Sequence, residues 1–246
     1  MPGDDGNGRI GADTAERVLV VAAHPDDIDF GAAGTVAGWV DAGIEVVYCI
    51  VTDGDAGGFD PAVPRSQIPA IRRAEQRAAA EVVGVRELHF LGYPDGRLTA
   101  TIELRRDIAR VIRQVRPRRV VCQSPDRMYE RIFASHPDHL AAGEATLCAV
   151  YPDARNEFAH PELAEEGLAP HTVEEVWLMA ARQADHHIDV TDTVDRKVKA
   201  LLCHVSQITE PDALEARIRG WGVAVAATGG LPEGRLAEGF QIVRTG

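Results

Sequence analysis

The sequence predicts an α/β protein whose sheet is mostly parallel and is covered by helices on both faces. Apolar, valine-rich runs of strand length alternate four times with helix-like segments. The runs are apolar at successive positions, as in strands that are buried on both faces of a parallel sheet. Each run ends in a polar loop marked by glycine or proline. Together these observations predict a Rossmann-like, doubly wound sheet with right-handed crossovers.

The predicted elements follow one another regularly over the first 150 residues. Strands are expected at residues 17–23, 45–51, 87–91 and 119–123. Helices are expected at about 31–43, 68–83 and 101–115, and from about 136 to 150. The first two helices should end at Gly43 and Gly84, because glycine commonly terminates helices.

The regularity weakens after residue 151. A polar stretch at 151–172 is the expected place for substrate specificity, and it precedes a strand near 176–180. Helices are expected near 194–204 and 212–224, followed by a C-terminal apolar segment at 240–243. Without an internal repeat or a low-complexity linker, residues 17–246 are predicted to form one domain. Residues 1–16 are rich in glycine and aspartate and are predicted to be a disordered tail.

Composition and charge exclude several classes of function. The 246 residues carry a formal net charge of −12, which argues against a nucleic-acid or anionic-membrane partner. No apolar run is long enough to span a membrane. The four cysteines have neither metal-knuckle nor CxxC spacing, so we expect reduced core cysteines in a cytoplasmic protein. A homo-oligomer is compatible with these features.

A histidine and two carboxylates follow the first predicted strand directly, in His24-Pro25-Asp26-Asp27. Adjacent carboxylates repel each other unless a cation or hydrogen bonds offset their charge, and a divalent metal supplies that offset. Pro25 fixes the backbone angle φ, so that the chain can leave the strand with His24 and Asp27 facing one point. The alternative is a solvated turn in which an aspartate caps the next helix.

A second cluster, Ser-His-Pro-Asp-His at residues 135–139, repeats this arrangement after the fourth strand. Ligands of open α/β sheets bind at the carboxyl edge of the strands, where both clusters should meet. His24, Asp27 and His139 would then supply two imidazoles and a carboxylate, with one coordination position left for water, as catalytic zinc requires. Fe²⁺ or another divalent metal is the alternative to Zn²⁺. His136 and Asp138 remain for catalytic or supporting roles.

The two clusters together resemble the PIG-L/LmbE-like family of zinc-dependent N-deacetylases. This family includes the N-acetylglucosaminyl-phosphatidylinositol de-N-acetylases and the deacetylases of mycothiol and bacillithiol synthesis. Weaker matches are found at residues 52–57, 72–75, 91–96 and 204–207. The resemblance implies a single deacetylase-like domain. It also implies hydrolysis of the amide bond of an N-acetylated amino sugar or of a related small metabolite.

The resemblance also implies roles for particular residues. His24, Asp27 and His139 would be the zinc ligands, and Asp26 would be the general base that activates water. His136 would stabilise the oxyanion or protonate the departing amine. Arg72 and Asp95 match positions that contact the sugar, and Asp55 is expected in the wall of the pocket.

Some positions depart from the family pattern or have no assigned role. Aspartates replace the more frequent glutamate at Asp29 and Asp55, and Ala33 replaces glycine, which leaves the substrate open. His186 and His187 are expected at a surface edge more than in the pocket. His204 lies in the last turn of a predicted helix, where a histidine gains from the helix dipole.

Three other functions compete with this interpretation. An Fe(II) oxygenase would also use two histidines and a carboxylate, although such sites carry His-x-Asp on a different fold. A nucleotide-binding module or methyltransferase fits the alternating pattern, but Gly-x-Gly-x-x-Gly does not follow the first strand. A catalytically silent relative that binds a sugar is the third. If the protein is a deacetylase of this family, the alternative to an amino-sugar substrate is an acylated secondary metabolite.

Overall fold

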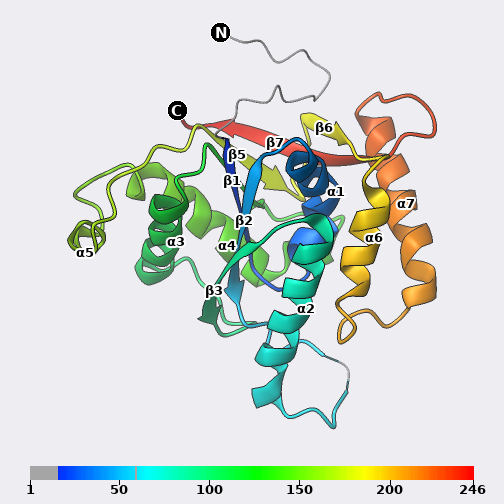
Figure 1. Ribbon diagram of the computed structural model, residues 1–246, viewed down its shortest axis with the longest axis horizontal. Coiled ribbons are helices and arrows are strands. Elements are labelled where there is room, and N and C mark those ends of the chain that lie inside the picture. The colour runs from blue at the N-terminus through cyan, green and yellow to red at the C-terminus, as the bar shows by residue number, and fades with distance from the viewer. Residues whose placement is uncertain (1–15, 59) are drawn as a thin grey trace.

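The computed structural model describes residues 16–58 and 60–246, and within these residues the chain forms a seven-stranded sheet (Figure 1). The strands are β1 (Arg17–Ala22), β2 (Glu45–Thr52), β3 (Glu87–Tyr93), β4 (Arg119–Gln123), β5 (Glu175–Met179), β6 (His186–Asp189) and β7 (Ala237–Arg244). Their order is β3-β2-β1-β4-β5-β7-β6. The first five are parallel neighbours, and β7 pairs antiparallel with both β5 and β6. The predicted α/β fold with a mostly parallel sheet is confirmed.

Helices cover both faces of this sheet, as Figure 1 shows. They are α1 (Asp27–Asp41), α2 (Ile68–Val83), α3 (Ile102–Val115), α4 (Pro137–Cys148), α5 (Pro161–Glu165), α6 (Val194–Leu202) and α7 (Pro211–Thr228). One core contains buried residues of α3 and α4, and the other contains buried residues of α1, α2, α6 and α7. The sheet is therefore the middle of three layers.

Strand β1 shows why the predicted strands are apolar at every position. Val18 and Val20 point into the core on the α1 side, whereas Leu19 and Val21 point into the core on the α3 side. All four side chains are fully buried. Because successive side chains of a strand face opposite ways, a central strand needs an apolar residue at each position.

Several boundaries differ from the sequence-based expectation by a few residues: for example, α7 extends to Thr228 and β7 spans Ala237–Arg244. Helix α1 begins at Asp27, about four residues earlier than predicted, because the turn at Pro25 and Asp26 is completed within two residues. The predicted tail, residues 1–16, lies outside the described residues except for Glu16. That residue is buried, and its carboxylate lies 3.3 Å from Nη1 of Arg119.

The stretch 151–172 packs against α3. Arg113 of α3 donates hydrogen bonds to backbone carbonyls of Asp153, Asn156 and Ala159. Its role in specificity stays a prediction. Among the residues that the structure describes, no helix is both long and apolar enough to cross a membrane.

All four cysteines are free, but only Cys49 and Cys122 are buried, since Cys148 and Cys203 are partly exposed. The expectation of core cysteines therefore holds for the first two alone. Cys49 is on β2 and Cys122 on β4, two central strands, whereas Cys148 and Cys203 lie at the C-terminal ends of α4 and α6.

The strand order reverses direction between β1 and β4. From β1 the chain adds β2 and β3 on one side of this strand. It then returns to add β4 and β5 on the other side. In such sheets the carboxyl ends of the two strands at the reversal open a crevice in which ligands bind. Gly143 of α4 packs closely at this point, because an added Cβ would lie 2.3 Å from the backbone oxygen of Gln123. Helix α4 is thus held directly against the end of β4.

Candidate metal centre and active site

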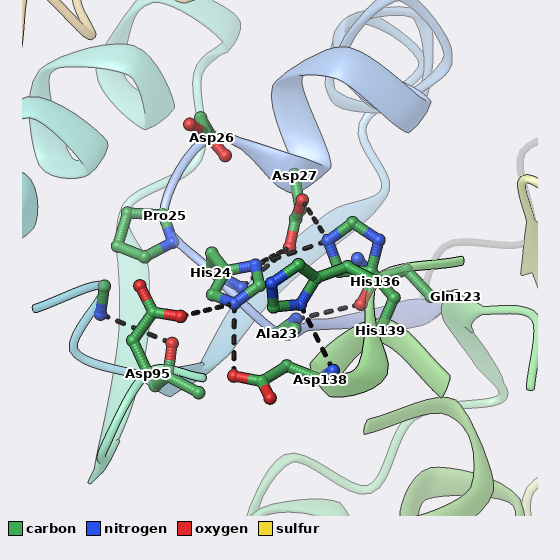
Figure 2. A network of polar contacts seen from close by, with 12 residues as sticks. Ala23, His24, Pro25, Asp26, Asp27, Asp95, Gln123, His136, Asp138 and His139 are labelled. Carbon is green, nitrogen blue, oxygen red and sulfur yellow. Dashed lines mark hydrogen bonds and ion pairs between the residues drawn. The ribbon is translucent and has the colours of Figure 1, made fainter. Parts of the chain in front are cut away.

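Two histidines and an aspartate converge at this reversal point (Figure 2). Nδ1 of His24 lies 3.3 Å from Nε2 of His139. The Asp27 carboxylate lies 3.2 Å from the first of these nitrogens and 3.0 Å from the second. Ligand atoms bound to one tetrahedral zinc at ~2.0–2.1 Å are separated by roughly 3.3 Å. The spacing of the three side chains therefore fits a shared divalent metal.

The second nitrogen of His24 faces carboxylates. Its Nε2 lies 3.0 Å from Oδ1 of Asp95 and 3.3 Å from Oδ2 of Asp138. Histidines that bind a metal commonly donate their other N–H to a carboxylate, which fixes the ring and its tautomer. Asp95 and Asp138 therefore suit the orientation of His24 with Nδ1 free for a metal.

His24 also belongs to two further groups of potential ligand atoms that lie within 4.8 Å of one another. One group joins His24 to His136 and His139, and the other joins it to Asp95 and Asp138. The second group uses the Nε2 side of the ring. We favour the Nδ1 side, because there the carboxylate of Asp27 and both imidazoles meet at distances of 3.0–3.3 Å.

The electrostatics of the cluster also favour a bound cation. Burial opposes a charge on His24, but Asp27 and hydrogen bonds to Asp138, Asp27 and Asp95 raise the pKa of the ring to about 12. Burial would raise the pKa of Asp27, yet the charges of His139 and His24 hold it well below its ordinary value. The carboxylates thus require positive charge between them, and either protons or a metal ion can supply it.

Asp26 has an unusual backbone that the surrounding structure maintains. Its φ of 95° lies in the left-handed region, which costs a non-glycine residue about 1–3 kcal/mol. Its backbone N–H donates to Oε1 of Gln76 at 2.8 Å, and its carboxylate accepts from Nη2 of Arg72 at 2.9 Å. This turn directs Asp26 and Asp27 to different surroundings, and Figure 2 shows Asp26 apart from the imidazoles.

The protonation of Asp26 is poised near neutrality. Burial raises the pKa of its carboxyl to about 6, although the positive charge of Arg72 acts in the opposite direction. A general base is most effective when its pKa lies near the working pH. The raised pKa suits a general base, and this role of Asp26 stays a prediction.

Arg72 is buried and braces the loops on either side of it. Its guanidinium donates to the backbone oxygens of Gly54 and Pro25 in addition to Asp26. Gly54 has a φ of 61°, and a Cβ there would lie 2.5 Å from Nη1 of Arg72. The expected contact of Arg72 with substrate stays a prediction, whereas its support of Asp26 is visible.

The other residues expected near the substrate lie in the same group of loops. The Asp55 carboxylate accepts from the backbone N–H of Asp95 at 2.9 Å and pairs with Arg65 at 2.7 Å. Asp95 is 8% exposed and faces His24, so its geometry suits the support of this ring. The roles of Asp55 and Asp95 in substrate binding stay predictions.

His136 is the N-cap residue of helix α4 and lies beside both other imidazoles. Its ring centroid lies 4.9 Å from that of His24 and 5.4 Å from that of His139. Its Nδ1 accepts from the backbone N–H of Asp138 at 3.2 Å, so a proton on the neutral ring resides on Nε2. Burial and the neighbouring histidine charges lower the pKa of His136. The neutral ring is therefore favoured, as a hydrogen-bond donor through Nε2.

A buried hydrogen-bond network behind Asp26 was not predicted from the sequence. Gln76 donates through Nε2 to Asp29 at 2.9 Å, and the same Oδ2 lies 2.9 Å from Nε2 of His204. Burial would lower the pKa of His204, but Asp29 raises it. The signal for this network was the weak match at 204–207, which could not reveal the partner of His204. The network holds Gln76, and with it the backbone of Asp26, in place.

His186 and His187 lie away from this centre. Both are on β6, the edge strand, as expected. The ring of His186 stacks edge-on against Trp177, with centroids 4.7 Å apart. Nε2 of His187 lies 3.3 Å from the hydroxyl of Thr228 on α7.

An apolar chamber of about 450 Å³, which sequence analysis also missed, opens on Asp27 and His139. It extends between α1, β5, α7 and β7. Most of its wall is apolar and includes Phe30, Met179, Val190, Trp221, Val225 and Leu236. These residues come from distant parts of the chain, and each one alone is an ordinary core or surface residue.

Comparisons with known proteins agree with this arrangement. The model of the PIG-L family, described as GlcNAc-PI de-N-acetylase, matches residues 19–150, more than half of the chain. Diacetylchitobiose deacetylase of Thermococcus kodakarensis is 34% identical over 79% of this chain and 71% of its own. The probable N-acetyl-alpha-D-glucosaminyl L-malate deacetylase 2 of Bacillus anthracis is 31% identical, with coverages of 77% and 80%.

A solved structure extends the similarity to the C-terminal part of the fold. N,N'-diacetylchitobiose deacetylase from Pyrococcus horikoshii superposes with a TM-score of 0.86 at 29% identity. The superposition covers 95% of this chain and 85% of that protein. It includes strands and helices beyond residue 150, where the family model ends. The chain therefore belongs to the PIG-L family of de-N-acetylases.

Proposed function

We propose that this protein is a cytoplasmic zinc-dependent N-deacetylase that removes the acetyl group from an N-acetylglucosamine-type amino sugar or its conjugate. Family membership makes it a deacetylase, a hydrolase of an amide C–N bond. The observation that carries the proposal is the spacing of His24, Asp27 and His139, with atoms 3.0–3.3 Å apart at the reversal of the sheet. The free cysteines support a reducing compartment.

The proposed ligands are Nδ1 of His24, the Asp27 carboxylate and Nε2 of His139. A zinc ion held by these residues would act as a Lewis acid, polarising the amide carbonyl and making water a stronger acid. Asp95 and Asp138 hold the His24 ring through Nε2. Both carboxylates lie on the Nε2 side of the ring, so Nδ1 faces Asp27 and His139.

Two residues would move protons. Asp26, whose pKa is raised to about 6, accepts a proton from the attacking water. His136 donates a hydrogen bond from Nε2–H to the developing oxyanion or to the departing nitrogen. Arg72 keeps the Asp26 carboxylate in place through the hydrogen bond at 2.9 Å.

The sugar would bind among the loops that carry Asp55, Arg72 and Asp95. These loops follow β2 and β3 at the carboxyl edge and are linked by the hydrogen bond from Asp95 N–H to Asp55. The relatives named for N-acetylated glucosamine compounds support this substrate class. An α/β fold also argues against the oxygenase alternative, whose sites belong to another architecture.

Mass spectrometry tests the reaction directly. Zinc-loaded protein is incubated with N-acetylglucosamine, diacetylchitobiose and an N-acetylglucosaminyl malate conjugate. We expect the loss of one acetyl group from at least one of them, and the loss of this reaction in His24→Ala. His89→Ala is the matched control, because His89 lies on the edge strand β3 and its ring pairs with Glu87. Intact sugars with the wild-type enzyme would contradict the proposal and favour an amidase acting on another metabolite.

A further inference from the structure

The apolar chamber is continuous with the proposed metal centre. Its wall includes Asp27 and His139, and its volume of about 450 Å³ lies within the range of small-molecule sites. An acetyl group carries a single methyl, so it would leave most of this volume unfilled. The removal of acetyl alone therefore leaves most of the chamber without an assigned role.

Besides Asp27, the charged residues of the lining are Arg131, which is exposed to solvent, and Lys197 and Glu238, which are buried and bonded to each other. Nζ of Lys197 lies 2.5 Å from Oε1 of Glu238 and 2.7 Å from the backbone oxygen of Phe30. The Glu238 carboxylate also accepts from the backbone N–H groups of Gly34 and Thr35. A sugar ring would exchange its hydrogen bonds with water for an apolar wall, which is unfavourable. The chamber is therefore suited to a hydrocarbon group.

The position of the chamber indicates which part of the substrate enters it. It contacts Asp27 and His139, but its wall does not include Asp26, His136 or Asp95. The amine must leave on the side of the residues that transfer protons. A substituent on the other side of the carbonyl would point towards the chamber. In Figure 2, Asp26 is turned away from His139 and Gln123, two residues of the chamber wall, whereas His136 lies beside His139.

We propose that the apolar chamber binds the alkyl chain of an N-acyl group longer than acetyl, so that the enzyme is a deacylase of N-acylated amino sugars. This inference rests on the proposed function. The oxygen of water adds to the acyl carbon, the C–N bond breaks, and the nitrogen takes a proton. The products are a fatty-acid carboxylate and a free amine.

A series of N-acyl glucosamines tests the inference. Acetyl, butanoyl, hexanoyl and octanoyl derivatives are compared by kcat/KM with zinc-loaded enzyme. Burial of one methylene contributes about 0.8 kcal/mol, so kcat/KM should rise by up to about fourfold per methylene until the chamber is filled. A flat or falling series, with the acetyl compound hydrolysed, would overturn the inference and leave the proposed function intact.

Two valines of α7 provide a matched pair of variants. Val225 lines the chamber, whereas Val223 is 49% exposed and outside its wall. Val225→Phe should fill the chamber and bring the ratio of octanoyl to acetyl kcat/KM close to one. Val223→Phe should keep the wild-type ratio. Thermal melting of both proteins checks that they fold, and equal ratios in the two variants would contradict the chamber as the binding site.

Direct binding separates the two proposals if no sugar is hydrolysed. That result would overturn the proposed function. The affinities of the protein for octanoate and acetate, measured by calorimetry, would then test whether the chamber binds alkyl chains. We expect octanoate to bind at least tenfold more tightly than acetate, and Val225→Phe to remove this preference. Equal affinities, or a preference that survives the variant, would overturn the inference. The inference would also be overturned if Val225→Phe changed the protein from oligomer to monomer and kept the preference for octanoate. In that case the chamber would be filled by a second copy of the chain.

Discussion

The centre around His24 and the apolar chamber share Asp27 and His139 but are opposite in chemistry. Around His24, every carboxylate and imidazole has a charged or hydrogen-bonded partner, and the groups come from loops after β1, β3 and β4. The chamber is lined mainly by apolar side chains of α1, β5, α7 and the segments beside β7. The centre around His24 carries the groups proposed for catalysis, and the apolar chamber offers volume next to them.

This difference suggests how one fold can keep its chemistry and change its substrate. The polar centre depends on distances of about 3 Å between atoms, so few substitutions preserve it. The chamber depends on volume and apolarity, which many combinations of side chains can provide. We therefore expect variants of the centre to lose turnover and variants of the chamber to alter selectivity or stability.

The largest effect should follow the loss of a proposed ligand. His139→Ala should release the metal and lower kcat/KM by about 1,000-fold or more, because the metal contributes several kcal/mol of transition-state stabilisation. His136→Ala is the informative comparison. It should keep one zinc per chain and lose turnover only. Metal content by plasma mass spectrometry, measured beside kinetics, separates the two, and the opposite pattern would make His136 the ligand.

The next largest effect should come from Asp26. Asp26→Asn keeps the shape of the side chain and tolerates the left-handed backbone, yet it cannot accept a proton. Turnover should fall by about 100-fold while zinc remains bound. Asp41→Asn, at the far end of the same helix α1, serves as the surface control. Wild-type turnover in Asp26→Asn would remove this residue from the proposed mechanism.

Sequence patterns predicted the polar centre because its chemistry is concentrated in two short motifs. His24 and Asp27 are three residues apart and follow a strand that is apolar at every position, and His136 and His139 begin one helix. The rule that strand ends share one edge then brings the motifs together. The early start of α1 was missed, because a non-glycine residue with φ of 95° has no distinct sequence signature.

The chamber could not be predicted for the opposite reason. Phe30 and Trp221 lie with ring centroids 6.5 Å apart, although 190 positions separate them in sequence. Each is an apolar residue on a helix, and only the tertiary arrangement decides whether it borders a cavity or fills the core. The C-terminal strand β7 posed the same difficulty, since its antiparallel pairing with β5 and β6 is a long-range property. Likewise, the partner of Asp95 was invisible until His24 was placed beside it.

A smaller effect should follow changes in the residues that hold His24. Asp138 is fully buried and accepts from the backbone N–H groups of Gly96 and Leu98 besides facing His24. Asp138→Asn should weaken zinc affinity by about 10- to 100-fold, since its amide replaces a carboxylate beside the ring. Competition with a chelator measures this affinity. Asp126→Asn, exposed on the loop after β4, should match the wild type. Unchanged affinity in Asp138→Asn would leave Asp95 as the group that orients His24.

The smallest effect should come from the wall of the chamber, and it should appear as stability. Val190 is 3% exposed and lines the chamber. Val190→Ala removes two methyl groups and should lower the free energy of unfolding by roughly 1–2 kcal/mol, as measured by urea denaturation. The loss stays at the low end for core residues, because one side of Val190 already borders empty volume. Val223→Ala, on the exposed face of α7, should change stability by less than about 0.5 kcal/mol. A loss of 3 kcal/mol or more in Val190→Ala would show that this wall is packed as tightly as the core. The contrast between a rigid polar centre and an adaptable chamber would then fail.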